Sequence, residues 1–456
     1  MKAIKQSASN YVIAAMSLLG VYIFSSQAPA VETFFAKSPE HHMESVFFII
    51  SVLFALSFIV FYVSRVAKLP SFVFAIFFGI AAHEALLPIT ENEGLLSILV
   101  ALGATLILFG GGIETPFHSF KKLMGKILSL SFPGLFITSF LFSWAVYGIA
   151  ILLGHPLSIP VAVLLGAVLA STDPAAIIPI LKDLRFKNNS IKDIIVSESA
   201  VTDVAGTLLT VIFIAIVTSA IDPGTLNSWY GAVFTPETGI VLAEQLFFGV
   251  VAGLLGYGLL EGLHKFKHSH DREFEVDSAF FLFVPIIIFA IALAFGGSGY
   301  LAAFIGGLLF HITEKLHETE KFFNHTIEGF LKPMIFMLLG ALINLESLMV
   351  YAPIGVVASL VFMIIIRPIA VFISLAPFYF WGKEKVTVKE MLFISAIRET
   401  GAIPAVLIVT IASLGIANID GLVEIGMWVI LMTLIVEPLL LPGIAKRLDV
   451  AEPVGR

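Results

Sequence analysis

Apolar runs of about 20 residues recur along the whole chain, and this pattern constrains the fold more than any other feature of the sequence. A run of that length lets an α-helix cross the hydrocarbon core of a bilayer. The 456 residues are 58% hydrophobic and only 13% charged, and the mean hydropathy is +1.01. Soluble globular domains do not have this composition. The sequence therefore predicts an all-α polytopic membrane protein.

Hydropathy divides the chain into about 14 predicted transmembrane spans. They lie near residues 10–27, 44–66, 69–88, 95–113, 128–154, 158–181, 191–219, 240–265, 277–296, 299–312, 328–350, 354–382, 387–410 and 422–445. The predicted transmembrane domain covers residues 44–445, after an N-terminal segment of residues 1–43 and before a short tail of residues 446–456. Within it we expect a first repeat at about 69–265 and a second at about 277–445, because paired halves are typical of secondary transporters.

Lysine and arginine residues gather in alternate loops, for example at Lys121 and Lys122, and again in the tail at Lys446 and Arg447. By the positive-inside rule, both ends of the chain face the cytoplasm. We therefore expect a multi-pass protein of a cell (inner) membrane with a cytoplasmic C-terminus. The chain has no cysteine, which excludes disulfides and thiolate metal sites.

The first span has two interpretations. Lys2 and Lys5, the apolar stretch that follows them and the small residues Ala28-Pro29-Ala30 are typical of a secretory signal with a cleavage site. The same residues also fit an extra transmembrane helix. The thirteen later spans do not depend on this choice.

Ionisable residues inside apolar spans are the strongest indication of function. Each costs about 2.5–3.5 kcal/mol at a helix centre, so six unpaired ones would cost on the order of 15–20 kcal/mol. They must therefore be compensated by one another and by water. Six of them cluster in four of the spans: Asp173, Glu198, Asp203, Arg367, Arg398 and Glu399.

Two of the spans that carry these residues also contain helix breakers. Pro174 removes a backbone donor and disfavours helical geometry at Asp173, so the helix should open at Thr172-Asp173. Gly401 and Pro404 interrupt the span at 387–410 in the same way. Paired interruptions in the two halves of a transporter indicate an ion site near the membrane midplane. At such a crossing Asp173 could balance exposed amide ends and Arg398 could balance carbonyl ends.

The span at 191–219 contributes two acids with different predicted roles. Ser199 and Asp203 are four residues apart and share a helix face, so they offer a hydroxyl and a carboxylate to one ion. Glu198 lies about 140° around the helix from Asp203. We assign Asp203 to binding the cation or the proton, and Glu198 to a structural ion pair with Arg367.

These residues resemble those of the NhaP-type monovalent cation:proton antiporters, a family related to the sodium/proton exchangers. Thr172-Asp173-Pro174 is similar to the TDP motif in the family's unwound helix, and residues 198–203 are similar to its E-S-x-x-N-D motif. Arg367 falls where the family has the arginine that pairs with the glutamate. Arg398 falls where it has the arginine of the second unwound helix. The resemblance covers residues 44–445.

The resemblance implies an NhaA-like inverted-repeat antiporter fold with two discontinuous crossing helices, about 13–14 transmembrane helices and a homodimer. It implies exchange of Na⁺ for H⁺ by alternating access, a role in pH homeostasis, no enzyme activity, no cofactor and no nucleic-acid partner. Members bind the cation through the positions that match Asp203, Asp173 and Ser199 and through the backbone around Thr172. The predicted Na⁺ ligands are thus Asp173, Ser199 and Asp203.

The chain departs from the family pattern at two positions. Thr202 replaces the Asn of electroneutral members and the Asp of electrogenic ones, and without a second adjacent carboxylate we expect one cation to exchange for one proton. Glu399 adds an acid where the family has Arg-Gly. It could neutralise Arg398 or alter the ion preference, and the sequence does not decide between these.

Three other functions compete with sodium/proton exchange. A potassium/proton antiporter differs only in the ion, because carboxylate oxygens do not by themselves fix cation size. A sodium-coupled solute symporter with broken helices would need more polar side chains than the spans offer. An intramembrane aspartic protease would need a GxGD-type acid, which neither Asp173 nor Asp203 is.

Overall fold

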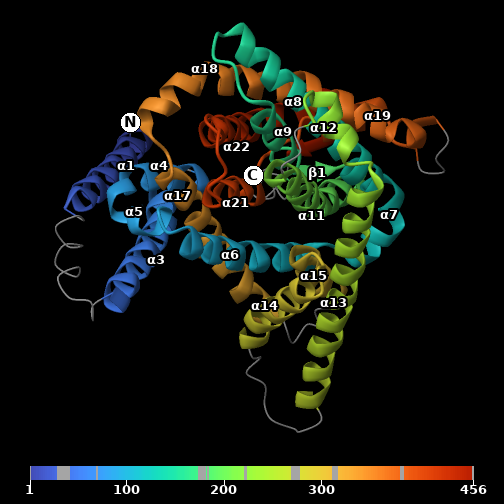
Figure 1. Ribbon diagram of the computed structural model, residues 1–456, viewed down its shortest axis with the longest axis horizontal. Helices are drawn as coiled ribbons and strands as arrows, with labels where there is room; N and C mark the ends of the chain where they lie inside the picture. Colours follow the sequence, from blue (N-terminus) through green and yellow to red (C-terminus); the bar gives the residue numbers. More distant parts are fainter. Residues whose placement is uncertain are drawn as a thin grey trace.

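The protein is almost entirely helical, in agreement with the sequence (Figure 1). The computed structural model describes residues 2–27, 42–67, 70–172, 181, 184–219, 223–268, 278–310, 317–380 and 385–453. Within these ranges, seven helices are long and apolar enough to cross a membrane, and one bent pair raises the number to eight. Five shorter apolar helices accompany them. The prediction of a polytopic helical membrane protein is confirmed.

The first part of the chain contains one sharp bend and one π-helical turn. Its elements are α1 (Lys2–Ser26), α3 (His42–Ala67), α4 (Ser71–Ala81), α5 (His83–Thr90), α6 (Glu93–Glu114), α7 (Phe117–Ser129), η2 (Leu130–Gly134), α8 (Leu135–Leu152), α9 (Ile159–Val168), β1 (Leu184–Phe186), α11 (Ser190–Thr218), α12 (Leu226–Ala232) and α13 (Pro236–His268). α4 and α5 meet at 88°. The loop lysines Lys121 and Lys122 lie on α7, so the span expected from residue 128 begins earlier, at Phe117.

The second part repeats the pattern of long helices with π turns. Its elements are α14 (Ser278–Ala294), α15 (Gly299–Leu309), α16 (His317–Thr326), η4 (Ile327–Leu331), α17 (Lys332–Ala341), α18 (Leu345–Val361), η5 (Phe362–Ile366), α19 (Arg367–Phe380), α20 (Val388–Ser395), α21 (Ala402–Ser413), α22 (Leu422–Leu448) and β2 (Ala451–Pro453). The boundary expected at residues 351–353 is wrong. α17 ends at Ala341, and the Asn344 side chain caps α18 by accepting the backbone N–H groups of Glu346 and Ser347.

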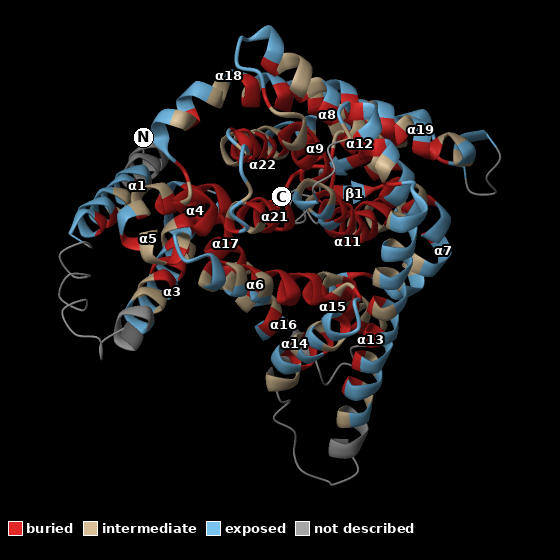
Figure 2. Ribbon diagram, viewed as in Figure 1, coloured by how far each residue is buried: buried red, intermediate tan, exposed pale blue. Residues whose placement is uncertain are grey.

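The short and broken helices lie at the centre of the molecule. Figure 1 shows α9, α11, α21 and α22 grouped there, with α8 and α18 along the upper edge and α6 below. Figure 2 shows that the central group is the most buried part of the fold. Every described residue of α21 from Ala402 to Val409 is buried. Arg398 and Glu399, in the segment before α21, are buried as well.

Several helix pairs approach each other closely through glycine, and two of them are α6 with α15 and α4 with α17. A side chain at Gly307 of α15 would collide with the Phe109 carbonyl on α6, and one at Gly340 of α17 would collide with the Ile76 carbonyl on α4. Small residues allow membrane helices to pack backbone to backbone. These contacts hold the outer helices around the centre.

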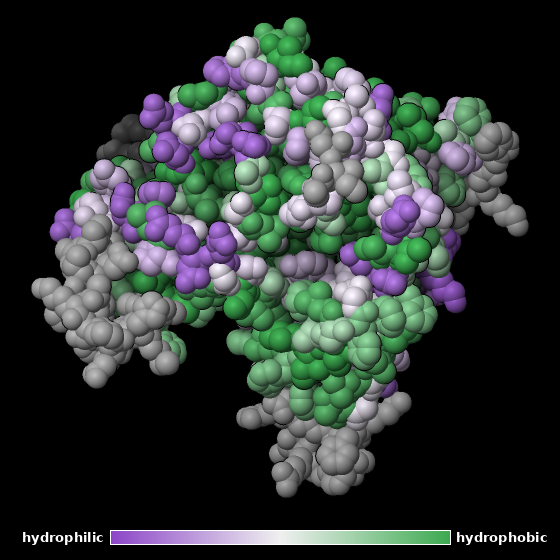
Figure 3. Space-filling view, viewed as in Figure 1, coloured by the Kyte–Doolittle hydropathy of each residue, from purple (hydrophilic) through white to green (hydrophobic). Residues whose placement is uncertain are grey.

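The outward faces of the peripheral helices are apolar. On α13, Phe247, Leu254 and Leu255 are exposed, as are Phe283 and Leu293 on α14. Figure 3 shows a continuous hydrophobic surface over α13, α14 and α15. Such a surface is stable against lipid tails and unfavourable in water.

The strands β1 and β2 form a small antiparallel sheet near the C-terminus. Leu184 of β1 pairs with Pro453 of β2, and Phe186 pairs with Ala451. The Nζ atom of Lys187 lies 2.6 Å from Oδ1 of Asp449, next to this sheet. The sheet joins the segment before α11 to the segment after α22.

Candidate functional site: two broken helices at the centre

The first broken helix stops one turn before the expected position. α9 begins at the cap residue Ser158 and ends at Val168, and Ser171 and Thr172 are not helical. Pro174 has no N–H to donate to the Ala170 carbonyl four residues earlier, so a break close to this position agrees with the sequence. Asp173 and Pro174 themselves lie outside the described residues. The expected meeting of Asp173 with Asp203 therefore stays a prediction.

Threonine hydroxyls hold the opened segment against α11. The Thr202 hydroxyl donates to the carbonyl of Ser199 (2.8 Å), so its lone pairs accept from Thr172. They receive the Thr172 N–H at 3.3 Å and the Thr172 hydroxyl at 2.9 Å. A backbone N–H that has lost its helical partner is thus satisfied by a side chain of the next helix.

Ser199 also binds the opened segment. Its hydroxyl donates to the Thr172 carbonyl at 2.7 Å, rather than to a carbonyl of its own helix. The oxygen atoms of Ser199 and Thr172 therefore lie side by side, and each keeps a lone pair for a further partner. Both side chains are buried.

Asp203 follows Thr202 on α11 and shares a face with Ser199. Its side chain is 8% exposed, in the middle of a helix long enough to span a membrane. The carboxylate, the Ser199 hydroxyl and the Thr172 carbonyl are the types of oxygen ligand that hard cations prefer. Three of the four predicted binding residues, Thr172, Ser199 and Asp203, thus belong to one region of the fold.

The predicted ion pair between Glu198 and Arg367 is present. Nη2 of Arg367 lies 3.1 Å and 3.0 Å from the two carboxylate oxygens of Glu198. The two side chains are 2% and 3% exposed. Arg367 follows the π turn η5, at the first residue of α19. The pair joins α11 to α19, and therefore the first part of the chain to the second.

The second broken helix opens where the sequence predicts. α20 ends at Ser395 and α21 begins at Ala402, so residues 397–401 are unwound. The hydroxyl of Thr433 on α22 donates to its own helix, at 3.0 Å to the carbonyls of Val429 and Ile430. It then accepts the Thr400 N–H at 3.2 Å and contacts the Thr400 hydroxyl at 2.6 Å.

Arg398 connects the two breaks. Its Nη2 donates to the carbonyl of Leu169, where α9 ends. Its guanidinium carbon lies 4.5 Å from the centre of the Phe362 ring, in a cation–π contact. The expected balance between Arg398 and exposed carbonyl ends is thus present. The neighbouring Glu399 is buried, and its role stays a prediction.

Glu437 of α22 contacts the second break, although the sequence favoured helix packing as the role of this residue. Its Oε2 atom accepts the Arg398 backbone N–H at 2.6 Å, and the side chain is 5% exposed. Thr433 and Glu437 are four residues apart and lie on one face of α22. Two polar residues at this spacing inside an apolar span were the available signal.

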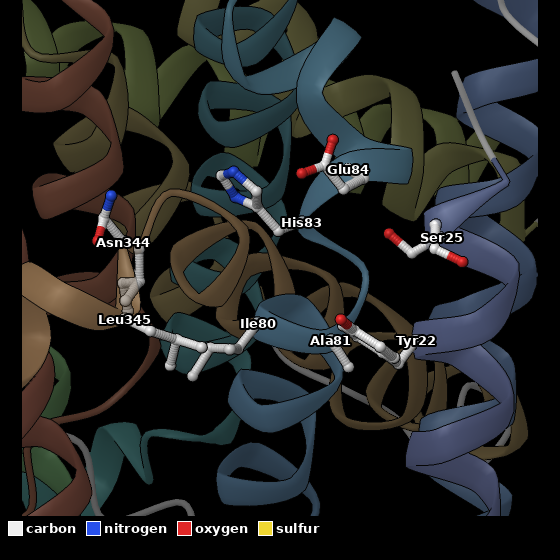
Figure 4. Close-up of a pocket in the computed structure, with 10 residues that line it drawn as sticks. Tyr22, Ser25, Ile80, Ala81, His83, Glu84, Asn344 and Leu345 are labelled. Carbon is white, nitrogen blue, oxygen red and sulfur yellow. The ribbon is translucent and has the colours of Figure 1, made fainter. Parts of the chain in front are cut away.

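A separate cavity lies away from the breaks. It has a volume of about 450 Å³ and is lined by described residues of α1, of the bend between α4 and α5, and of the turn before α18. Figure 4 shows His83 and Glu84 at the bend, with Tyr22 and Ser25 facing them from α1. Nδ1 of His83 is 2.6 Å from the Ala341 carbonyl, so this nitrogen is the donor and the ring is held in place.

Comparison with known proteins places this geometry in a family. Residues 46–447 match the family model described as "Sodium/hydrogen exchanger, transmembrane". The chain is 26% identical over 420 residues to a protein named K(+)/H(+) antiporter NhaP from Alkalimonas amylolytica, covering 89% of this chain and 67% of that protein. It is 27% identical over 360 residues to K(+)/H(+) antiporter NhaP2 from Shewanella sp. (strain MR-4), covering 77% and 58%. The chain thus spans less than two thirds of the length of NhaP2.

Two proteins of Methanocaldococcus jannaschii are also similar. The chain is 25% identical over 338 residues to "Probable Na(+)/H(+) antiporter 2" of Methanocaldococcus jannaschii, covering 72% of this chain and 76% of that protein. Its fold matches the structure of the sodium proton antiporter MjNhaP1 from the same organism at pH 8, with a TM-score of 0.68 and 22% identity. That match covers 87% of this chain and 99% of MjNhaP1. The likeness confirms the antiporter fold expected from the sequence.

Proposed function

Since this chain belongs to the sodium/hydrogen exchanger family of membrane transporters, we propose that it exchanges a monovalent cation, Na⁺ before K⁺, for H⁺ by alternating access. The observation that carries the proposal is the grouping of the Thr172 carbonyl, the Ser199 hydroxyl and Asp203 at the first helix break. Asp173, next to Thr172 in the chain, completes the proposed ligand set. The site belongs to a transporter, and the cation is its cargo.

The proposed exchange rule is competition at one carboxylate. Asp203 binds either the cation or a proton, because protonation removes the charge that holds a hard cation. Thr202 accepts hydrogen bonds from Thr172, and it brings no second charge beside Asp203. One cation then exchanges for one proton, and the cycle is electroneutral.

Potassium/proton exchange is the second candidate. It is favoured by the names of two relatives, which are called K(+)/H(+) antiporters. The proposed ligands are oxygens at a helix break, and oxygen ligands alone do not select cation size. Direct comparison of the ions therefore decides between the candidates.

The remaining parts of the proposal concern assembly and topology. We propose a homodimer in a cell (inner) membrane, with a cytoplasmic C-terminus and a role in pH homeostasis. Two halves at about 69–265 and 277–445 would form an inverted repeat. The paired breaks support this division, as do the π turns η2 and η5 inside the spans 117–152 and 345–380.

The test is a proteoliposome assay with a pH-sensitive dye. A proton gradient is imposed, Na⁺, K⁺ and Li⁺ are added in turn, and wild type is compared with Asp203→Asn. The proposal predicts cation-evoked proton movement that is lost in Asp203→Asn and does not depend on a potassium–valinomycin voltage clamp. Asp193→Asn, at a partly exposed aspartate in the first turn of the same helix, is the matched control. Proton movement that survives in Asp203→Asn would rule out the mechanism.

A further inference from the structure

We propose that Thr433 and Glu437 of α22 form an anchor that positions Arg398 and, through it, the first helix break. The inference rests on the proposed function, because it concerns how the cation site is held. Both residues hold the backbone of the unwound segment, at Arg398 and at Thr400, so both act as positioning residues.

The anchor satisfies backbone groups that the break exposes. Helix ends leave amide groups without helical partners, and a buried one must find another acceptor. α22 supplies two such acceptors at i and i+4, the Thr433 hydroxyl for the Thr400 N–H and the Glu437 carboxylate for the Arg398 N–H. The unwound segment is therefore fixed to one face of α22 at two alternate residues.

Fixing the backbone of Arg398 also directs its side chain. The guanidinium lies on the Phe362 ring and donates to the Leu169 carbonyl. Leu169 is three residues before Thr172, whose carbonyl is a proposed ligand. A chain of contacts thus runs from α22 through Arg398 to the cation site.

The role of Glu437 is that of a hydrogen-bond acceptor with a fixed position. Glu437→Gln keeps an oxygen that can accept the Arg398 N–H, whereas Glu437→Met fills a similar volume without an acceptor. Thr433→Ser keeps the hydroxyl and Thr433→Val removes it at nearly constant shape. These pairs separate the hydrogen bond from the charge and from the packing.

Transport kinetics give the first test. We expect Thr433→Val and Glu437→Met to raise the KM for the cation about tenfold, the effect of leaving one buried N–H unsatisfied, with a smaller change in kcat per folded protein. Thr433→Ser and Glu437→Gln should stay within about threefold of wild type. Ile435→Ala, at an exposed residue of the same helix, is the control. A wild-type KM in Thr433→Val and Glu437→Met, or equal effects of Glu437→Gln and Glu437→Met, would overturn the proposal.

Amide hydrogen exchange gives a test that does not depend on transport. The amide of residue 400 should exchange about tenfold faster in Thr433→Val, and that of residue 398 about tenfold faster in Glu437→Met. Unchanged exchange at both amides would refute the anchor even if transport is normal. If wild type moves no protons with any cation, the proposed function fails while the exchange data still decide on the anchor. Should Thr433→Val yield no folded protein, exchange of the residue 398 amide in Glu437→Met still decides on the anchor.

Discussion

In both helix breaks, a threonine hydroxyl accepts a backbone N–H of the unwound segment. At each break, the hydroxyl of a threonine on the next long helix donates to its own helix and accepts the N–H of a threonine in the unwound segment. In the first break this pair is Thr202 with Thr172, and in the second it is Thr433 with Thr400. The feature that the two breaks share is therefore a pair of uncharged threonine side chains.

The difference between the breaks lies in what surrounds the threonine pair. At the first break, the Ser199 hydroxyl donates to the Thr172 carbonyl, and the buried Asp203 lies one helical turn from Ser199 on α11. At the second, Glu437 accepts a backbone N–H and Arg398 reaches back to the first break. This difference agrees with the proposal that the first break binds the cation and that the second positions the first.

The largest expected effect concerns the ion pair that joins the two parts of the chain. Glu198→Gln leaves the Arg367 guanidinium buried without its counter-charge, and breaking a buried pair costs about 3–5 kcal/mol. The measurement is thermal unfolding of the purified protein in detergent. The double variant Glu198→Gln/Arg367→Gln should recover part of the loss, because no charge is then left alone. Equal stability of wild type and Glu198→Gln would contradict the structural role of the pair.

The next effect tests whether the two breaks have the different roles proposed for them. Asp203→Asn should reduce cation-evoked proton movement at least about a hundredfold, since a charged ligand worth about 3 kcal/mol is lost. Its stability should change little, because the amide has nearly the same shape. Glu437→Gln should retain most of the activity. If Glu437→Gln were inactive and Asp203→Asn active, the roles of the two breaks would be reversed.

A smaller effect should distinguish the two threonine pairs. Thr202→Val and Thr433→Val each remove one acceptor, at a cost of about 1–3 kcal/mol. Of these two threonines, Thr202 is the one that contacts Thr172, whose carbonyl is a proposed ligand. We therefore expect Thr202→Val, and not Thr433→Val, to change the ratio of the KM values for Na⁺ and K⁺. Thr202→Ser, which keeps the hydroxyl, should restore the ratio. An identical change of ratio in both valine variants would show that the breaks do not differ in this way.

The sequence predicted those features of the site whose absence would cost much free energy in a membrane. Charges inside apolar spans must find partners, which is why the pair of Glu198 with Arg367 and the contact of Arg398 with a helix end followed from the sequence. Gly401 and Pro404 marked the second break for a similar reason, because each weakens a helix by its own backbone.

The features that sequence reasoning missed involve small or ambiguous signals. A threonine in an apolar helix usually bonds its own backbone, and Thr433 does so, which hides its second role in holding Thr400. Lys121 and Lys122 indicated a loop, yet they lie on the amphipathic helix α7. The turn before α18 contains no charge or proline, and only the cap residue Asn344 marks it.

The smallest expected effect concerns the ion pair of Lys187 with Asp449, which joins the segment before α11 to the segment after α22. Lys187 follows the first broken span and Asp449 follows α22; their side chains are 55% and 57% exposed. The hydrogen bond from Lys187 and its positive charge lower the pKa of Asp449, and the hydrogen bond to Asp449 raises the pKa of Lys187. The contribution of Asp449 is therefore present above its unfolded pKa of about 3.9 and is lost as the pH falls through the lower folded value.

For Lys187 the sign is opposite, so its contribution is present below about pH 10.4 and is lost as the pH rises through the raised value. Between about pH 5 and 9 the contact is thus constant, and it cannot set a pH response near neutrality. Asp449→Asn keeps a residue that tolerates the left-handed backbone at this position, where φ is 59°. We expect its transport rate to have the same pH profile as wild type between pH 6 and 9, with slightly faster amide exchange in β2. A shifted profile would place a pH-sensing role at the joined ends rather than at the breaks, because no other group is changed.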